Sequence, residues 1–176
     1  MPEDGFTLWF TGLPGAGKST LARAVCEQLL SRGRRVELLD GDEVRATLSK
    51  DLGFSKEDRD AHVSRIGYVA RLLSRNGVAV VVAAIAPYRK VRQQIRDGQA
   101  RPFFEVYLEC PLDELVRRDK KGLYVKALQG DVANFTGISD PYEPPLTPDL
   151  HIRTDLESAE QSTAAVIGWL ERTGVV

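Results

Sequence analysis

Short runs of apolar residues alternate along the chain with longer stretches in which apolar residues recur every three or four positions. The short runs predict strands, and the amphipathic stretches between them predict helices. The expected strands are residues 6–11, 36–39, 78–85 and 103–108 and a short strand at Ile152, and the expected helices are residues 18–32, 58–75, 88–97, 112–118 and 157–172. Alternating strands and helices form βαβ units with right-handed crossovers. We therefore expect an α/β fold, a three-layer sandwich around a central parallel sheet.

Residues 119–148 follow neither pattern. This stretch begins with charged residues and a glycine at 119–122 and ends in a proline-rich run at 141–148. A long irregular segment inside a compact domain is usually functional or disordered. The aromatic and charged residues here are typical of a lid over an active site. Since no linker or repeat interrupts the chain, we expect residues 1–176 to form one domain with a lid segment at about 119–148.

A phosphate-binding sequence directly follows the first expected strand. Residues 12–19 match the pattern G-x-x-x-x-G-K-S, between an apolar run and an amphipathic helix. The glycines let successive N–H groups face one anion, and the helix that starts near Lys18 adds its positive end. Lys18 would reach the β- and γ-phosphates of ATP, and the Ser19 hydroxyl would bind Mg²⁺. The expected ATP-binding residues of this P-loop are Gly12, Leu13, Pro14, Gly15, Ala16, Gly17, Lys18, Ser19 and Thr20.

Two carboxylates follow the second expected strand, in the sequence Asp40-Gly41-Asp42. The carboxyl ends of parallel strands converge at the ligand crevice, so both acids would lie near the bound phosphates. One would orient the ligands of Mg²⁺, and one would accept a proton from an attacking hydroxyl. An alternative stays open, because aspartate is also a good N-cap for a helix that begins near Glu43.

The composition excludes some classes of function. The chain of 176 residues has 24 basic and 25 acidic residues, whereas nonspecific nucleic-acid binders usually carry a clear positive excess. No apolar run approaches the ~18 residues of a membrane span, and residues 1–5 contain no signal peptide. The two cysteines, Cys26 and Cys110, form no disulfide framework and suit a reducing compartment. We expect a cytoplasmic protein without nucleic-acid or membrane partners.

Beyond the P-loop, the chain resembles the adenylylsulfate kinases. These P-loop kinases transfer the γ-phosphoryl group of ATP to the 3′-hydroxyl of adenosine 5′-phosphosulfate (APS), giving 3′-phosphoadenosine 5′-phosphosulfate (PAPS) in sulfate assimilation. The matching segments are GLPGAGKST (12–20), LDGDEVR (39–45), LGFSKEDRD (52–60), APYR (86–89), FFEVYLECPLDELVRRDKKGLYVKALQG (103–130) and FTGISDPYEPP (135–145). They occur in the order of the family and span nearly the whole chain. The resemblance implies a magnesium-dependent ATP:APS phosphotransferase that forms a homodimer.

The resemblance also implies a role for each matched residue. Asp42 would be the catalytic or Mg²⁺-organising acid, supported by Asp40 and by the P-loop lysine, Lys18. Ser19 and Asp42 would hold the metal. The implied contacts to the nucleotides are Arg45 and Arg59 to the phosphosulfate, Phe54 and Phe135 to the two faces of the APS adenine, Lys121 to APS from the lid, and Arg118 to ATP.

Two positions depart from the family pattern. His62 stands where the family usually has an asparagine that contacts APS. Ala86 stands where many members have a serine that carries a phosphate in some of them, although Ile85 would still offer backbone contacts to the substrate. An imidazole lacks the fork of an amide and titrates near pKa ~6.5, so we expect APS to bind more tightly as the pH falls toward 6. The alternatives are a kinase for another nucleoside or small hydroxylated substrate, and a nucleotide-binding module without catalysis.

Overall fold

Five strands pair in parallel into one sheet in the computed structural model, which describes residues 4–176. The strands are β1 (Phe6–Thr11), β2 (Val36–Asp40), β3 (Ala79–Ala83), β4 (Phe103–Glu109) and β5 (Leu150–Arg153). Their spatial order is β2-β3-β1-β4-β5, so the first strand of the chain is the middle of the sheet. Every residue of β1 and β3 is buried, which explains why these two segments are almost continuously apolar.

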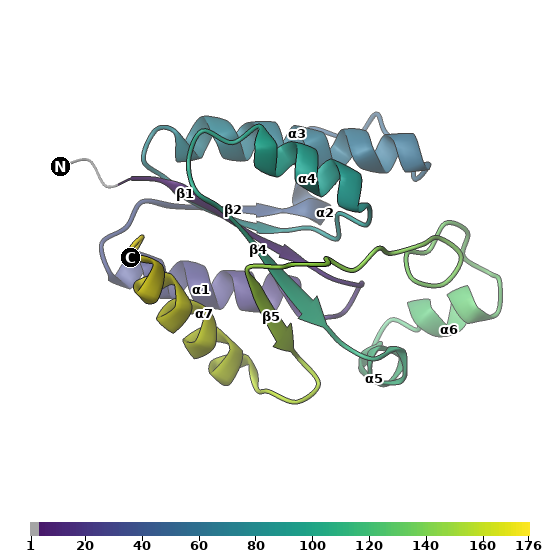
Figure 1. Cartoon of the computed structure of the whole chain (residues 1–176). Helices are drawn as coiled ribbons and strands as arrows, with labels where there is room; N and C mark the ends of the chain where they lie inside the picture. Colours follow the sequence, from purple (N-terminus) through teal and green to yellow (C-terminus); the bar gives the residue numbers. More distant parts are fainter. Residues whose placement is uncertain (1–3) are drawn as a thin grey trace.

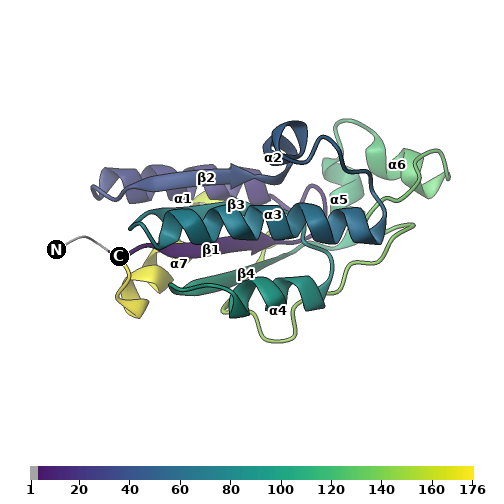
Figure 2. The same cartoon turned by 90° about the horizontal axis from the view of Figure 1, so that it is seen from above.

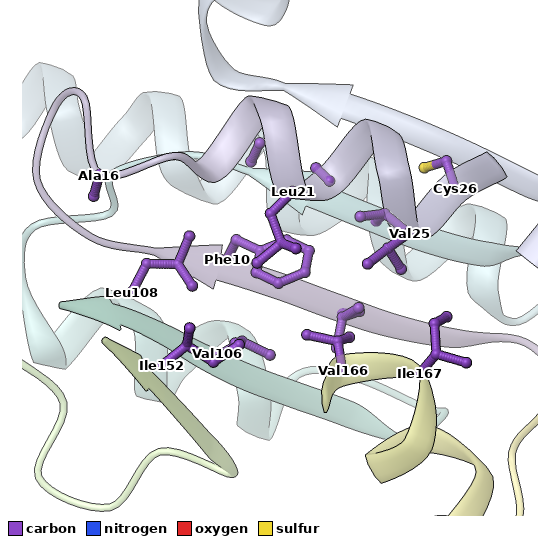
Figure 3. Close-up of a cluster of buried hydrophobic side chains, with 14 of the residues drawn as sticks. Phe10, Ala16, Leu21, Val25, Cys26, Val106, Leu108, Ile152, Val166 and Ile167 are labelled. Carbon is purple, nitrogen blue, oxygen red and sulfur yellow. The ribbon is translucent and has the colours of Figure 1, made fainter. Parts of the chain in front are cut away.

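Helices cover both faces of the sheet (Figure 1). One face carries α1 (Lys18–Ser31) and α7 (Ala159–Thr173), and the other carries α3 (Lys56–Ser74) and α4 (Arg89–Asp97). The pleat of β1 divides its side chains between two cores, with Phe10 facing α1 and α7 and Trp9 facing α3 and α4. Figure 3 shows the first core, in which Phe10 lies among residues from α1, α7, β4 and β5. The expected three-layer α/β sandwich is confirmed.

Three short helices lie near the carboxyl ends of the strands. They are α2 (Gly41–Thr47), α5 (Leu112–Arg118) and α6 (Leu123–Leu128). Figure 2 shows α5 and α6 at the end of the molecule opposite the C-terminus. The pattern predicted α5 and the four long helices to within about two residues. A helix near Glu43, which is α2, was expected only in the capping alternative, and α6 was not predicted. No helix in residues 4–176 is long and apolar enough to cross a membrane.

Candidate active site

The P-loop joins β1 to α1 and turns sharply between them. Gly12 is pressed against the neighbouring strand, where a Cβ atom would lie 2.5 Å from the carbonyl oxygen of Leu108. The Lys18 ammonium folds back over the loop and donates hydrogen bonds to the carbonyls of Gly12 (2.9 Å) and Leu13 (2.8 Å). Burial lowers the pKa of Lys18 to about 8, and the charges of Asp42 and Asp40 oppose that shift. At neutral pH the loop therefore still presents a cation beside its N–H groups.

The two carboxylates after β2 have different roles in the structure. Asp40 is the N-cap of α2, since its Oδ1 accepts a hydrogen bond from the Asp42 N–H at 3.0 Å. Its Oδ2 accepts a hydrogen bond from the Ser19 hydroxyl at 2.6 Å, which ties α2 to the P-loop helix. The capping alternative is thus confirmed for Asp40. Asp42, in the first turn of α2, is left to face the cavity beside the P-loop.

A cavity of about 510 Å³ gathers most of the predicted site along the carboxyl edge of the sheet. It is bounded by the P-loop, the start of α2, the start of α3 and the segment after β3. The predicted residues that line it are Pro14, Gly15, Gly17, Lys18, Ser19, Thr20, Asp40, Asp42, Arg45, Phe54, Arg59, His62, Ile85 and Ala86. Gly41, Val63, Ala83, Ala84 and Pro87 also line it, although the sequence did not predict them as site residues. The cavity is large enough for a small-molecule ligand.

The exposed aromatic ring of Phe54 lies near two guanidinium groups. The centre of the Arg45 guanidinium lies 4.8 Å from the ring centroid, and that of Arg59 lies 5.8 Å from it. Arg45 also donates to the Gly53 carbonyl at 2.9 Å, which holds it beside the ring. An aromatic face flanked by cations is suited to an anionic molecule that carries a base.

Arg59 is buried, and the lid segment occupies most of its hydrogen-bond donors. Its Nε donates to the Phe54 carbonyl at 3.0 Å, and its terminal nitrogens reach the Thr136 hydroxyl at 2.5 Å and the Asn134 carbonyl. An ion pair to Asp140 at 3.3 Å completes the set. Arg59 therefore holds residues 134–140 against the start of α3, and its implied contact with phosphosulfate stays a prediction.

Six of the predicted residues do not line the cavity: Gly12, Leu13 and Ala16 of the P-loop, and Phe135, Lys121 and Arg118 from the second half of the chain. Phe135 packs edge-on against Tyr124, with ring centroids 4.9 Å apart, and Lys121 is exposed on the lid segment. Arg118 pairs with Glu114 at 2.7 Å and donates to the Thr154 carbonyl at 2.5 Å. Their implied contacts with APS and ATP stay predictions.

Sequence reasoning missed two tyrosines that connect the lid segment to the P-loop. The Tyr124 hydroxyl donates to the Pro14 carbonyl, and the Tyr142 hydroxyl lies 2.9 Å from the hydroxyl of Thr11, the last residue of β1. Burial raises the pKa of both phenols, so both stay protonated and able to donate. The available signal was an aromatic residue inside a polar or proline-rich motif, in KGLY and in DPYEPP.

His62 lines the cavity from α3 with only 7% of its surface exposed. Burial, followed by the charge of Arg45, lowers its pKa to about 4, and the Gly41 backbone and Asp42 oppose that shift. The expectation that His62 titrates between pH 7.5 and 6 is therefore wrong for the free protein. The ring is neutral throughout that range.

The low pKa of His62 makes stability depend on pH. Between about pH 6.5 and 4 the unfolded chain binds a proton at residue 62 that the folded protein does not. The free energy of unfolding should therefore lose a contribution as the pH falls through that interval, and the contribution is fully present above it. Denaturant unfolding should give a flatter pH profile for His62→Asn than for the wild-type chain. Identical profiles would contradict the buried, neutral imidazole.

The comparisons with known proteins agree on one family. The family model described as adenylylsulphate kinase matches residues 4–153. An adenylyl-sulfate kinase of Chloroflexus aurantiacus is 56% identical over 174 residues, covering 99% of this chain and 93% of that protein. An adenylyl-sulfate kinase of a Picosynechococcus species is 50% identical over 176 residues, covering 100% of this chain and 99% of that protein.

Solved structures lead to the same family. The chain is similar to the Mycobacterium tuberculosis APS kinase in complex with AMPPNP and APS, with a TM-score of 0.91 and 43% identity over 97% of this chain and 99% of that one. A gluconokinase from Sinorhizobium meliloti shares only the fold, at 18% identity and a TM-score of 0.63, covering 98% of this chain and 95% of that one. With the family match, the close relatives and the intact P-loop cavity together, this chain belongs to the adenylylsulfate kinase family.

Proposed function

We propose that this chain transfers the γ-phosphoryl group of ATP to the 3′-hydroxyl of APS and releases ADP and PAPS. Membership of the adenylylsulfate kinase family supports this reaction. The observation that carries it is the joint lining of one cavity by Lys18 of the P-loop, the carboxylate of Asp42 and the ring of Phe54. The triphosphate, the reacting hydroxyl and the acceptor base then each have a matching surface within one site.

The chemistry needs positioning and charge neutralisation more than covalent help from the protein. The 3′-oxygen forms a bond to the γ-phosphorus, the bond from that phosphorus to the bridging oxygen breaks, and ADP departs with the electron pair. Asp42 orients the hydroxyl and accepts its proton. Lys18 balances the charge that builds on the phosphoryl oxygens, and Arg45 balances that of the phosphosulfate.

The residues beside the P-loop fit a magnesium ion that arrives with the nucleotide. Residues 4–176 contain no group of three or more His, Cys, Asp or Glu side chains that could hold a metal ion. The Ser19 hydroxyl and the Asp42 carboxylate instead offer hard oxygen ligands at the edge of the cavity. Two protein ligands are enough for Mg²⁺, because this ion usually keeps several water and phosphate oxygens as its other ligands. When bound, it would neutralise charge on the phosphates.

Three further properties belong to this proposal. The lid segment would exclude water from the reaction, and its contacts through Arg59 and Tyr124 support that role. A cytoplasmic location is supported by the two free, buried cysteines. A homodimer is implied by the family resemblance, and light scattering of the purified chain would test it.

Product analysis tests the function directly. Incubation with ATP, Mg²⁺ and APS should give equal amounts of ADP and PAPS, and adenosine 5′-monophosphate or other nucleosides in place of APS should give far less product. Turnover of another hydroxylated substrate at the rate of APS would contradict the assigned acceptor. Binding of both nucleotides without product in a single turnover would point to a non-catalytic module.

The exposed ring of Phe54 makes a sharp prediction about the acceptor. Phe54→Ala should weaken APS binding by ~1–3 kcal/mol, the range for stacking between a base and an aromatic ring, with little change in ATP binding. Tyr68→Ala is a matched control, because Phe54 and Tyr68 are both 54% exposed but Tyr68 does not line the cavity. Calorimetric titration measures both ligands. Equal weakening of APS and ATP would contradict a ring dedicated to APS.

A further inference from the structure

One wall of the cavity is held in a strained backbone conformation. Ala86 has φ 46°, in the left-handed region that residues with a Cβ atom rarely adopt. It is 1% exposed, and with Ile85 it lines the cavity. Such a conformation persists only where the surroundings hold it in place. The groups that contact residues 85 and 86 therefore control the shape of this wall.

Arg92 of α4 supplies the main restraint on Ala86. The side chain is buried and donates one hydrogen bond to the Ala86 carbonyl at 2.6 Å and another to the Glu143 carbonyl at 2.7 Å. Its Nε lies 2.7 Å from Glu105 Oε1 on β4, and both side chains of this ion pair are largely buried. The planar guanidinium can serve two carbonyls and one carboxylate at once, which an ammonium group cannot do.

A second set of hydrogen bonds restrains Ile85. The Thr11 hydroxyl donates to the Ile85 carbonyl at 2.5 Å and also contacts the Tyr142 hydroxyl. The ring of Tyr142 lies under the Arg92 guanidinium, 5.8 Å away. Residues 140–145, here called the strap, are thus fastened to the wall on two sides, through Arg92 and through Thr11.

We infer that Arg92 is a positioning residue for the acceptor, which sets the Ile85–Ala86 wall of the APS-binding part of the cavity and couples it to the strap. The inference rests on the proposed function for the identity of the acceptor. Arg92 is absent from the lining of the cavity, so it acts through Ala86 and not by contact with the nucleotide. Within residues 4–176, no hydrogen bond joins the P-loop to Arg92 or Ala86. A change in the wall should therefore affect the binding of ATP much less than the binding of APS.

The first test replaces the guanidinium while keeping its charge. Arg92→Lys retains a cation for Glu105 but cannot reach both carbonyls, so the KM for APS should rise about tenfold, the scale of one lost charge-assisted hydrogen bond. The KM for ATP and kcat at saturating APS should change by less than about threefold. Arg96→Lys is the matched control: it lies one turn further along α4, pairs with Asp149 and donates to the Phe103 carbonyl, away from the wall.

Hydrogen exchange gives a readout that needs no substrate. Amides at residues 84–86 should exchange faster in Arg92→Lys than in the wild-type chain and in Arg96→Lys. Unchanged exchange would overturn the restraint on the wall, whatever the enzyme phosphorylates. Faster exchange with an unaltered KM for APS, or a parallel rise in both KM values, would overturn the positioning role. If the wild-type chain does not phosphorylate APS, the proposed function fails while the exchange result still tests the restraint.

Two more variants distinguish the proposed role of Arg92 from a general loss of folding. Tyr142→Phe removes only the hydroxyl that meets Thr11 and should raise the KM for APS by about threefold without affecting ATP, in line with one neutral hydrogen bond. In an Ala86→Gly background the left-handed conformation has no steric cost, so Arg92→Lys should change the KM for APS less than it does in the wild-type background. Additive effects of the two substitutions, or an unaltered KM in Tyr142→Phe, would overturn the inference.

Discussion

Lys18→Ala is expected to lower kcat/KM by at least ~10², because it removes a preorganised cation from the site where phosphoryl charge develops. The ammonium is already placed by hydrogen bonds to Gly12 and Leu13, so little reorganisation precedes the reaction. Folding should survive, because the substitution also removes the cost of burying a charge, which is the main cause of the lowered pKa of Lys18. Steady-state kinetics and thermal unfolding measure the two effects separately.

An exposed lysine provides the control for Lys18. Lys50→Ala removes the same charge from the surface and should leave kcat/KM unchanged. Turnover of Lys18→Ala close to that of the wild-type chain would show that this loop does not bind the transferring phosphoryl group.

Asp42→Asn is expected to abolish most activity, by ~10² or more, with almost no change in Tm. The substitution keeps the shape of the side chain but removes the charge and the proton acceptor. Stability should not suffer, because the cap of α2 is Asp40 and not Asp42. The neighbouring variant Asp40→Ala should behave differently, losing about 1 kcal/mol of stability with its cap.

The pair of aspartate variants separates catalysis from capping. Asp42→Asn should bind ATP and APS but form product at least ~10²-fold more slowly. Asp40→Ala should unfold at a lower temperature and also lose the hydrogen bond from Ser19. An active Asp42→Asn, or one that is as destabilised as Asp40→Ala, would contradict the proposed proton acceptor.

The sequence predicted the parts of the site that local pattern determines. A strand, a glycine-rich turn and a helix N-terminus follow one another in residues 6–31, so the phosphate-binding loop could be predicted before any tertiary contact was known. The same holds for Asp40 and Asp42, because the carboxyl ends of parallel strands must meet at one edge. The five strands and four long helices follow from periodicity in the same way.

Other features depend on contacts that no local pattern encodes. Helix α6 is only 6 residues long, with Leu123, Val125 and Leu128 exposed, so it has no amphipathic signature. The position of Phe135 depends on its contact with the ring of Tyr124. The position of Gly137 depends on Leu13, because a Cβ atom on residue 137 would lie 2.6 Å from the Leu13 side chain. Burial gave His62 its low pKa, which an ordinary reference value cannot reveal.

The place of β1 in the sheet also determines when the protein can fold during its own synthesis. Residues 6–11 leave the ribosome before their partners in the sheet, which are residues 79–83 and 103–107. At about 5–20 residues per second, this largely apolar segment waits several seconds for the first partner and longer for the second. Nascent chains that end before residue 79 should therefore bind holdase chaperones through this segment, and chains that extend well past residue 109 should release them.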